Sequence, residues 1–274
     1  DVAYKRMPIF DNEAELEAYR RVFDEYVRLL TDEVGLRLPR CGFASVEGRN
    51  GEPVVFLAQE KYHHSSIASN VVHRVGPEDA VRLFEAVLER LALLWEYNAL
   101  RDDVLLGIDG QISNWAVTSI DPADEALPGD VELVYLDTST PFIRVGGAEQ
   151  LNPELFLRSA PSFMAWLLRT LFLQGVMDRY YDFHLVVVDL IANFYKEQLA
   201  GLIPRLVGAA NDFFSRGVAG FATDPVTEKE VRSYYREDAL IWRLYLGARK
   251  ADRFLRTKVS HKSYPYILPG RIKR

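Results

Sequence analysis

Three polar side chains stand at the ends of short apolar runs in the middle of the chain. Asp109 and Asn114 lie between the apolar runs at 104–108 and 115–117, and Asp137 ends a third run at 131–136. Phosphoryl transfer from ATP needs one carboxylate beside the attacking hydroxyl, with an amide oxygen and a second carboxylate to hold Mg²⁺ against the phosphates. This spacing predicts that Asp109 acts as the base and that Asn114 and Asp137 bind Mg²⁺.

The same residues also fit a purely structural role. Asp109 and Gly110 suit a polar turn between two buried strands, and Asn114 suits a cap at its end. Asp109 and Asn114 are nevertheless the only Asp and Asn five positions apart, in that order, in the 274 residues. The pair alone leaves both interpretations open, so the elements around it have to be considered.

The N-terminus supplies a strand that ends in a lysine. Residues 2–5 alternate apolar and polar side chains, as a half-buried strand does, and end at Lys5. A helix is predicted to start near Asn12, since apolar residues then recur at helical spacing up to Leu30. We expect Glu17 on this helix to pair with Lys5, because it lies beside the apolar stripe. Other carboxylates are within reach, and Lys5 alone also fits a surface lysine. These other carboxylates are Glu13, Asp24 and Glu25.

Between these two motifs the sequence predicts a hairpin and a long helix. Strands are expected at 41–46 and 54–59, joined by a turn that contains Asn50-Gly51, a strong hairpin signal. Residues 60–62 then form a short connection. A long amphipathic helix is predicted at 77–100, and it leads the chain to Asp109.

This order of elements resembles the protein-kinase-like fold, and in particular its small-molecule branch of aminoglycoside phosphotransferases and choline kinases. The resemblance implies an α+β, bilobal architecture, with a small β-rich lobe at 1–62 and a large helical lobe at 63–274 that carries the catalytic loop and the acceptor region. It further implies the following roles: Asp109 as catalytic base, Asn114 and Asp137 as Mg²⁺ ligands, Lys5 with Glu17 as the phosphate-positioning pair, Glu60 and Tyr62 at the hinge, and Ala116 beneath the adenine of ATP. The run at 135–142 is also similar to an uncharacterised bacterial family on this fold.

Three departures from the protein-kinase pattern carry information. Gly107-Ile108 replaces His-Arg, so there is no arginine to bind a phosphorylated activation loop. Thr138-Ser139 replaces Phe-Gly after the metal-binding Asp, which argues against a mobile Phe switch. No glycine occurs before Gly35, so a Gly-rich loop over the phosphates is missing. Either two strands of the small lobe lie before Asp1, or the protein binds nucleotide without them.

The chain after Asp137 is predicted to be almost wholly helical. Helices are expected to begin at 152 or 153 and to cover 161–178, 181–202, 204–216 and 227–256. Asp189 and Asn193 lie four apart on one face of an apolar helix, and buried polar groups need partners. They fit two roles equally well: they could hold this helix to the catalytic loop, or they could contact the acceptor.

Composition excludes several classes of protein. Hydrophobic residues make up 49% of the chain, enough for a large core, and no run approaches the roughly 18 to 20 apolar residues of a membrane span. One cysteine, Cys41, cannot form an internal disulfide, and with no visible signal segment it favours a cytoplasmic location. The net charge of −6 does not suggest a nucleic-acid partner. Residues 249–274 hold nine Lys or Arg and one acidic residue, a pattern most typical of a solvated basic end.

Two functions from different classes remain open. The first is an ATP- and Mg²⁺-dependent phosphotransferase that acts on a small hydroxylated metabolite or an antibiotic-like compound. The second is a kinase-like protein that binds a nucleotide or a partner without transfer. The sequence names neither the acceptor nor the oligomeric state.

Overall fold

A three-stranded antiparallel sheet and one long helix form the N-terminal part of the structure. The computed structural model describes residues 1–259 apart from 9, 49–52, 153, 158–172 and 218–222. Strands β1 (Val2–Arg6), β2 (Cys41–Glu47) and β3 (Pro53–Glu60) are arranged in the order β1-β3-β2. The predicted strands are therefore confirmed, whereas the Asn50-Gly51 turn lies outside the described residues.

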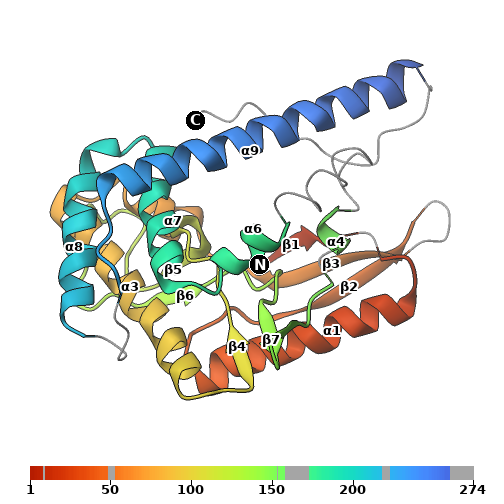
Figure 1. Cartoon of the computed structure of the whole chain (residues 1–274), viewed down its shortest axis with the longest axis horizontal. Helices are drawn as coiled ribbons and strands as arrows, with labels where there is room; N and C mark the ends of the chain where they lie inside the picture. The colour runs from red at the N-terminus through yellow and green to blue at the C-terminus, as the bar shows by residue number, and fades with distance from the viewer. Residues whose placement is uncertain (9, 49–52, 153, 158–172, 218–222, 260–274) are drawn as a thin grey trace.

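Helix α1 (Glu13–Arg28) covers one face of this sheet (Figure 1). Its N-cap is Asn12, whose side chain accepts a hydrogen bond from the main-chain N–H of Glu15, as an N-cap should. The predicted helix is thus confirmed, and it continues into a π-helical turn at Leu29–Glu33. The apolar faces of α1 and the sheet form a core of their own, whose buried members are Met7, Phe10, Leu16, Tyr19, Phe23, Val55, Leu57, Leu151 and Leu155. Leu151 and Leu155 show that this core also takes side chains from beyond the expected boundary at 62.

The direction of Lys5 follows from the register of the sheet. Lys5 lies opposite Leu57 in the antiparallel pair of β1 and β3. Directly opposed residues point to the same face of a sheet, and the side chain of Leu57 is fully buried on the face toward α1. The side chain of Lys5 is therefore directed to the inner face, while Tyr4, one position earlier, is exposed on the outer face.

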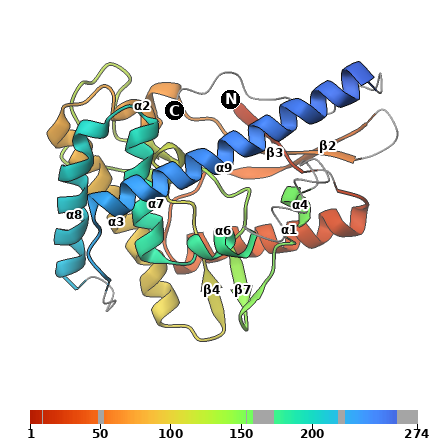
Figure 2. The same cartoon turned by 45° about the horizontal axis from the view of Figure 1, so that its top comes forward.

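Helices form most of the remaining structure. A short connection with η2 (His64–Ser66) and α2 (Ala68–Val71) leads into the 23-residue helix α3 (Pro77–Ala99). Later come α4 (Glu154–Leu157), α6 (Leu173–Arg179), α7 (Phe183–Lys196), η4 (Ala200–Leu202), α8 (Ile203–Ser215), α9 (Glu228–Phe254) and η6 (Leu255–Val259). α9 packs against α7 and α8 and then extends past them as a long, straight helix (Figures 1 and 2). In the described part of the chain, no helix is both long and apolar enough to cross a membrane.

Short strands lie between α3 and the later helices. β5 (Trp115–Val117) and β6 (Leu133–Tyr135) form a hairpin, preceded by the 3-10 turn η3 (Ile112–Asn114). β4 (Val104–Leu106) pairs with β7 (Ile143–Val145), and β7 pairs with β8 (Ala148–Glu149).

The expectation of an almost wholly helical chain after Asp137 was wrong for this segment, because β7 and β8 follow it. They are too short to show an alternating pattern, but the turn between them is Gly146-Gly147. Both glycines have positive φ, of 55° and 80°, which is the backbone of a tight hairpin turn. Part of the expected helix at 161–178 lies outside the described residues, and the described part ends in α6.

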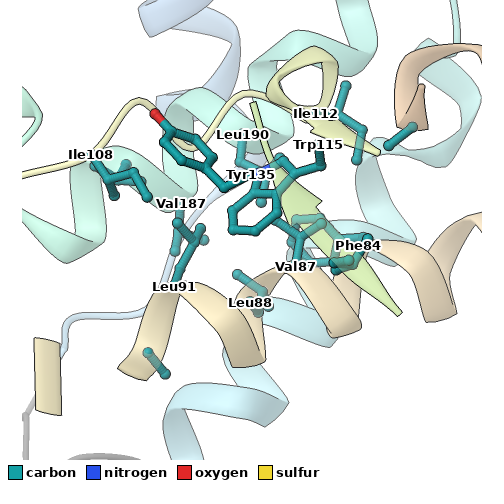
Figure 3. Close-up of a cluster of buried hydrophobic side chains, with 14 of the residues drawn as sticks. Phe84, Val87, Leu88, Leu91, Ile108, Ile112, Trp115, Tyr135, Val187 and Leu190 are labelled. Carbon is teal, nitrogen blue, oxygen red and sulfur yellow. The ribbon is translucent and has the colours of Figure 1, made fainter. Parts of the chain in front are cut away.

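The main hydrophobic core holds the short strands against α3 and α7. Figure 3 shows this cluster, in which side chains of α3 meet those of α7 around the segment from 108 to 135. Trp115 and Tyr135 face each other across the hairpin, with ring centroids 5.1 Å apart. The labelled residues are Phe84, Val87, Leu88, Leu91, Ile108, Ile112, Trp115, Tyr135, Val187 and Leu190. The loop that carries Asp109 and Asn114 is therefore anchored at both ends by buried apolar residues.

Candidate active site

The loop from 107 to 114 follows a path on which two glycines are required. A Cβ atom on Gly107 would lie 2.8 Å from the carbonyl oxygen of Tyr180, and one on Gly110 would lie 2.7 Å from a methyl group of Val186. Real Cβ atoms do not approach other atoms so closely, so only glycine lets this loop pack directly on the start of α7. The glycines thus fix the position of Asp109, which lies between them.

Asp109 is held in a poorly solvated place, and no Lys, Arg or His among the described residues forms an ion pair with it. One of its carboxylate oxygens accepts a hydrogen bond from the main-chain N–H of Gln111, at 3.2 Å. Burial raises the pKa of Asp109 to about 7, and the negative charges of Asp189 and Asp137 add to the rise. A carboxyl with a pKa near neutrality can both accept and release a proton, as a general base must.

Asn114 is positioned beside Asp137 by the pairing of β5 and β6. Trp115 pairs with Tyr135 in the hairpin, and the N–H of Leu136 donates to the carbonyl oxygen of Asn114 at 2.7 Å. Asp137 comes directly after this contact. The side-chain nitrogen of Asn114 donates to the main-chain oxygen of Asp109 at 3.1 Å, which orients the amide and leaves its oxygen available as an acceptor. The structure therefore brings together the three residues that the sequence singled out.

Asp137 has the opposite electrostatic environment to Asp109. Its Oδ1 atom accepts from the Lys5 ammonium at 2.9 Å, from the Ser139 hydroxyl at 2.7 Å and from the Ser139 N–H at 3.3 Å. Burial on its own raises the pKa of Asp137, but the charge of Lys5 and these hydrogen bonds outweigh it and hold the pKa below its ordinary value. Asp137 is therefore ionised at neutral pH, as a metal ligand must be.

The expected pair of Lys5 and Glu17 is not formed in this structure. Lys5 contacts Asp137 instead, and Glu17 pairs with Arg20 one turn along α1, at 2.6 Å. Because Glu17 is well exposed, it gains more from a neighbouring guanidinium at the surface than from reaching inward to Lys5. The position of Lys5 in β1 agrees with the sequence analysis, whereas its observed partner, Asp137, differs from the expected one.

The residues expected around the adenine lie at the end of the sheet and in β5. Glu60 is the last residue of β3, opposite Val2, and the half-buried Tyr62 follows it. Ala116 lies in the middle of β5 and forms an isolated bridge to Ile67. Its side chain is fully buried, so it is less accessible than a direct contact with adenine requires.

A polar group that the sequence left undecided lies on the other side of Asp109. The side-chain nitrogen of Gln111 donates to a carboxylate oxygen of Asp189 in α7, at 3.2 Å. Burial raises the pKa of Asp189 to about 6, and the charge of Asp238 on α9 adds to the rise. Of the two roles considered for Asp189, the structure shows the first: Asp189 is hydrogen-bonded to Gln111 of the catalytic loop. A separate contact between Asp189 and an acceptor stays a prediction.

The oxygen atoms that Asn114 and Asp137 offer suit Mg²⁺ better than a metal ion whose ligands all come from the protein. In the described ranges, no group of three or more His, Cys, Asp or Glu side chains is placed to hold a metal ion. Mg²⁺ does not need such a group, because it is commonly bound by one or two carboxylates together with substrate phosphates and water. The amide oxygen of Asn114 and the carboxylate of Asp137 are hard oxygen donors of that kind.

Two contributors to the site were not recognised in the sequence. Gln111 links Asp109 to Asp189, and Ser139 donates twice to Asp137. A signal for Ser139 was present, since Asp side chains often accept hydrogen bonds from residues two positions later. No comparable local signal existed for Gln111, because its partner in α7 is 78 residues away.

Comparison with known proteins gives a family but no function. No curated protein and no solved structure matches the chain significantly. One family model covers residues 1–254, nearly the whole sequence. The chain accordingly belongs to DUF6206, a family of unknown function.

Proposed function

We propose that this protein is an ATP- and Mg²⁺-dependent phosphotransferase that acts on a hydroxyl group of a small molecule. The observation that carries the proposal is the convergence of four side chains from distant parts of the chain. Lys5 contacts Asp137 across 132 positions of sequence, Asn114 is paired beside Asp137, and Asp109 lies next to both. A polar turn between strands accounts for the placing of Asp109 and Asn114, but not for the presence of Lys5.

The charges of these residues suit the parts of phosphoryl transfer. Asp137 and the amide oxygen of Asn114 would hold Mg²⁺, which neutralises charge on the phosphates when it is bound. Lys5 would leave Asp137 to contact the phosphates, since the cation then takes over the neutralisation of Asp137. Asp109, with its raised pKa and no cation beside it, would accept the proton of the acceptor hydroxyl.

A second candidate is a kinase-like protein that binds nucleotide without transfer. The observation that favours it is the ion pair itself, because Lys5 occupies the carboxylate that would bind the metal. The pair is accessible to water, with the Lys5 side chain 53% exposed and that of Asp137 26% exposed. An exposed pair of this kind typically contributes only about 0–1 kcal/mol, so it is a weak barrier to a divalent cation. We therefore favour transfer.

The decisive experiment compares turnover with nucleotide binding in Asp109→Asn. General-base assistance typically contributes about 10²–10⁴ in rate, and it acts mainly in the transition state. We expect Asp109→Asn to bind Mg·ATP as the wild type does and to lose most ADP release with a panel of sugars, amino alcohols and aminoglycosides. Asp121→Asn, at an exposed aspartate in the loop between β5 and β6, is the matched control and should retain activity.

One outcome replaces the proposal by the alternative. If the wild type binds Mg·ATP but releases no more ADP than Asp109→Asn with any acceptor in a broad metabolite extract, the protein is a binding module and not an enzyme.

A further inference from the structure

Every hydrogen bond that the described residues make to the Asp137 carboxylate ends on the same oxygen. Lys5 and both donors of Ser139 donate to Oδ1, and none of these hydrogen bonds ends on Oδ2. Three donors at distances of 2.7–3.3 Å fill the acceptor capacity of Oδ1 and fix the rotation of the carboxylate group. The carboxylate therefore presents one saturated oxygen and one that is left for another ligand.

Ser139 is in turn held from helix α1. The Tyr19 hydroxyl donates to the main-chain carbonyl oxygen of Ser139 at 2.9 Å, across 120 positions of sequence. Burial raises the pKa of Tyr19 far above its ordinary value, so its hydroxyl is always protonated and able to donate. Tyr19 is itself fixed by aromatic contacts with Phe10, Phe23 and Phe43. Tyr19 and Ser139 are 4% and 7% exposed, so water does not compete well for this bond.

We propose that Ser139 and Tyr19 are positioning residues for the divalent cation, and that they hold Asp137 with its Oδ2 atom directed to the metal. This inference rests on the proposed function, because it assigns a role within the same site. Ser139 acts on the carboxylate directly, and Tyr19 acts through Ser139. Residues that orient a metal ligand in this way commonly affect metal affinity as strongly as a weak ligand does.

The arrangement accounts for how the site keeps its geometry when Lys5 moves. Lys5 is the only one of the three donors on a long, half-exposed side chain, and it has a second task at the phosphates. The two donors of Ser139 remain on Oδ1 after Lys5 has left. Asp137 therefore does not rotate at the moment at which the cation arrives.

The test measures the Mg²⁺ concentration that gives half of the Mg²⁺-dependent rise in melting temperature at saturating ATP. This readout reports metal binding and needs no acceptor and no turnover. We expect Ser139→Ala to raise the half-saturating Mg²⁺ concentration by about 10- to 100-fold, the usual effect of losing a residue that orients a metal ligand. Ser139→Thr retains the hydroxyl and should restore a value close to that of the wild type. Tyr19→Phe should give a smaller increase in the same direction.

Tyr181→Phe is the matched control for Tyr19→Phe. Tyr181 is also a buried tyrosine, and its hydroxyl donates to the Glu149 carboxylate at 2.7 Å. Its loss should lower the melting temperature as the loss of the Tyr19 hydroxyl does, but should leave the half-saturating Mg²⁺ concentration unchanged. A purely structural role for Tyr19 predicts the same result for both variants.

Two negative results are distinguishable. If the wild type shows a Mg²⁺-dependent rise and Ser139→Ala has the same half-saturating concentration, the positioning role is overturned while the proposed function stands. If the wild type shows no Mg²⁺-dependent rise with ATP, the proposed function fails and the positioning role fails with it.

Discussion

The two carboxylates of the site differ more from each other than their common residue type suggests. Asp109 lies on a loop packed against α7, and burial together with the charges of Asp189 and Asp137 raises its pKa to about 7. Asp137 lies at the end of a hairpin opposite the N-terminal sheet, and Lys5 and Ser139 hold its pKa below the ordinary value. One carboxyl is therefore close to its titration point at neutral pH, and the other is ionised there.

This difference supports the two proposed roles without reference to any relative. Pairs of acidic groups whose pKa values are driven apart commonly divide the work of a reaction, one moving a proton and the other holding charge. The helical region raises the pKa of Asp109 because it supplies apolar surface and a further carboxylate. The sheet lowers the pKa of Asp137 because it supplies a lysine. The N-terminal and C-terminal parts of the chain thus give opposite properties to two adjacent side chains.

The largest effect on binding is expected from Asp137→Ala. A ligand that binds only the native state stabilises it by mass action, by about 2.7 kcal/mol at a hundredfold excess over Kd. In the wild type, ATP should raise the melting temperature more with Mg²⁺ than without it, and Asp137→Ala should lose the Mg²⁺-dependent part. An equal shift in wild type and variant would remove Asp137 from the metal site.

A smaller effect concerns how stability depends on pH. The folded pKa of Asp109, about 7, lies above the ordinary aspartate value of 3.8, so its contribution to stability is full below about pH 4 and is lost as the pH rises toward 7. At about 1.4 kcal/mol for each pKa unit, and with a discount because water reaches part of the carboxyl group, we expect a loss on the order of 2 kcal/mol. Asp109→Asn should flatten the stability curve across this range, as measured by urea unfolding at several pH values. Curves of the same slope would show that the pKa of Asp109 is not raised.

The contribution of Asp137 to stability changes with pH in the opposite direction and over a different pH range. Its folded pKa is lowered, so its stabilising contribution is present above the unfolded pKa and is lost as the pH falls through the folded value. The two carboxylates therefore act on stability in separate ranges of pH, and the Asp109→Asn curve can be interpreted without interference from Asp137.

Substitution of Lys5 should change ligand binding more than stability. The side chain of Lys5 is 53% exposed, and exposed ion pairs contribute about 0–1 kcal/mol, so Lys5→Met should lower the free energy of unfolding by less than about 1 kcal/mol. Its affinity for Mg·ATP, measured by calorimetric titration, should fall more than this, because a phosphate contact is lost. Lys229→Met, at an exposed lysine of α9, serves as the control. If Lys5→Met binds Mg·ATP with the affinity of the wild type, Lys5 does not contact the phosphates.

The smallest effect is expected from Glu17→Gln. Glu17 pairs with Arg20 at the surface of α1, and such a pair contributes little. The free energy of unfolding should change by less than about 0.5 kcal/mol, and the affinity for Mg·ATP should stay the same. A clear loss of affinity would instead show that Glu17 turns to Lys5 when nucleotide binds, as the sequence analysis first suggested.

The sequence predicted most of the elements that carry the site, because these elements have strong local signals. The alternation at β1, the capped stripe of α1 and the long apolar face of α3 are each patterns within one continuous stretch of 5, 16 and 23 residues, and such local patterns fix secondary structure. The pairing of Lys5 with Asp137 was not predictable in this way. It depends on the register of β1 against β3 and on an exposed carboxylate, Glu17, finding a nearer partner in Arg20.

The short strands and the hydrogen bonds between distant side chains were also not predictable from local sequence patterns. β7 and β8 have three and two residues, too few for periodicity to appear, and only Gly146-Gly147 marks their turn. The bonds from Gln111 to Asp189 and from Tyr19 to Ser139 join residues 78 and 120 positions apart. Such contacts follow from how helices pack, which no single stretch of sequence specifies.

The central claim is that the two carboxylates are held in opposite states, and the most direct measurement is their titration. Carboxyl ¹³C shifts of labelled aspartate can be followed against pH, with the two signals assigned by their absence in Asp109→Asn and Asp137→Asn. We predict that Asp109 titrates near pH 7 and that Asp137 titrates below the ordinary aspartate value of 3.8. Titration of Asp109 at or below that value, or of Asp137 above it, would contradict the division of roles between them.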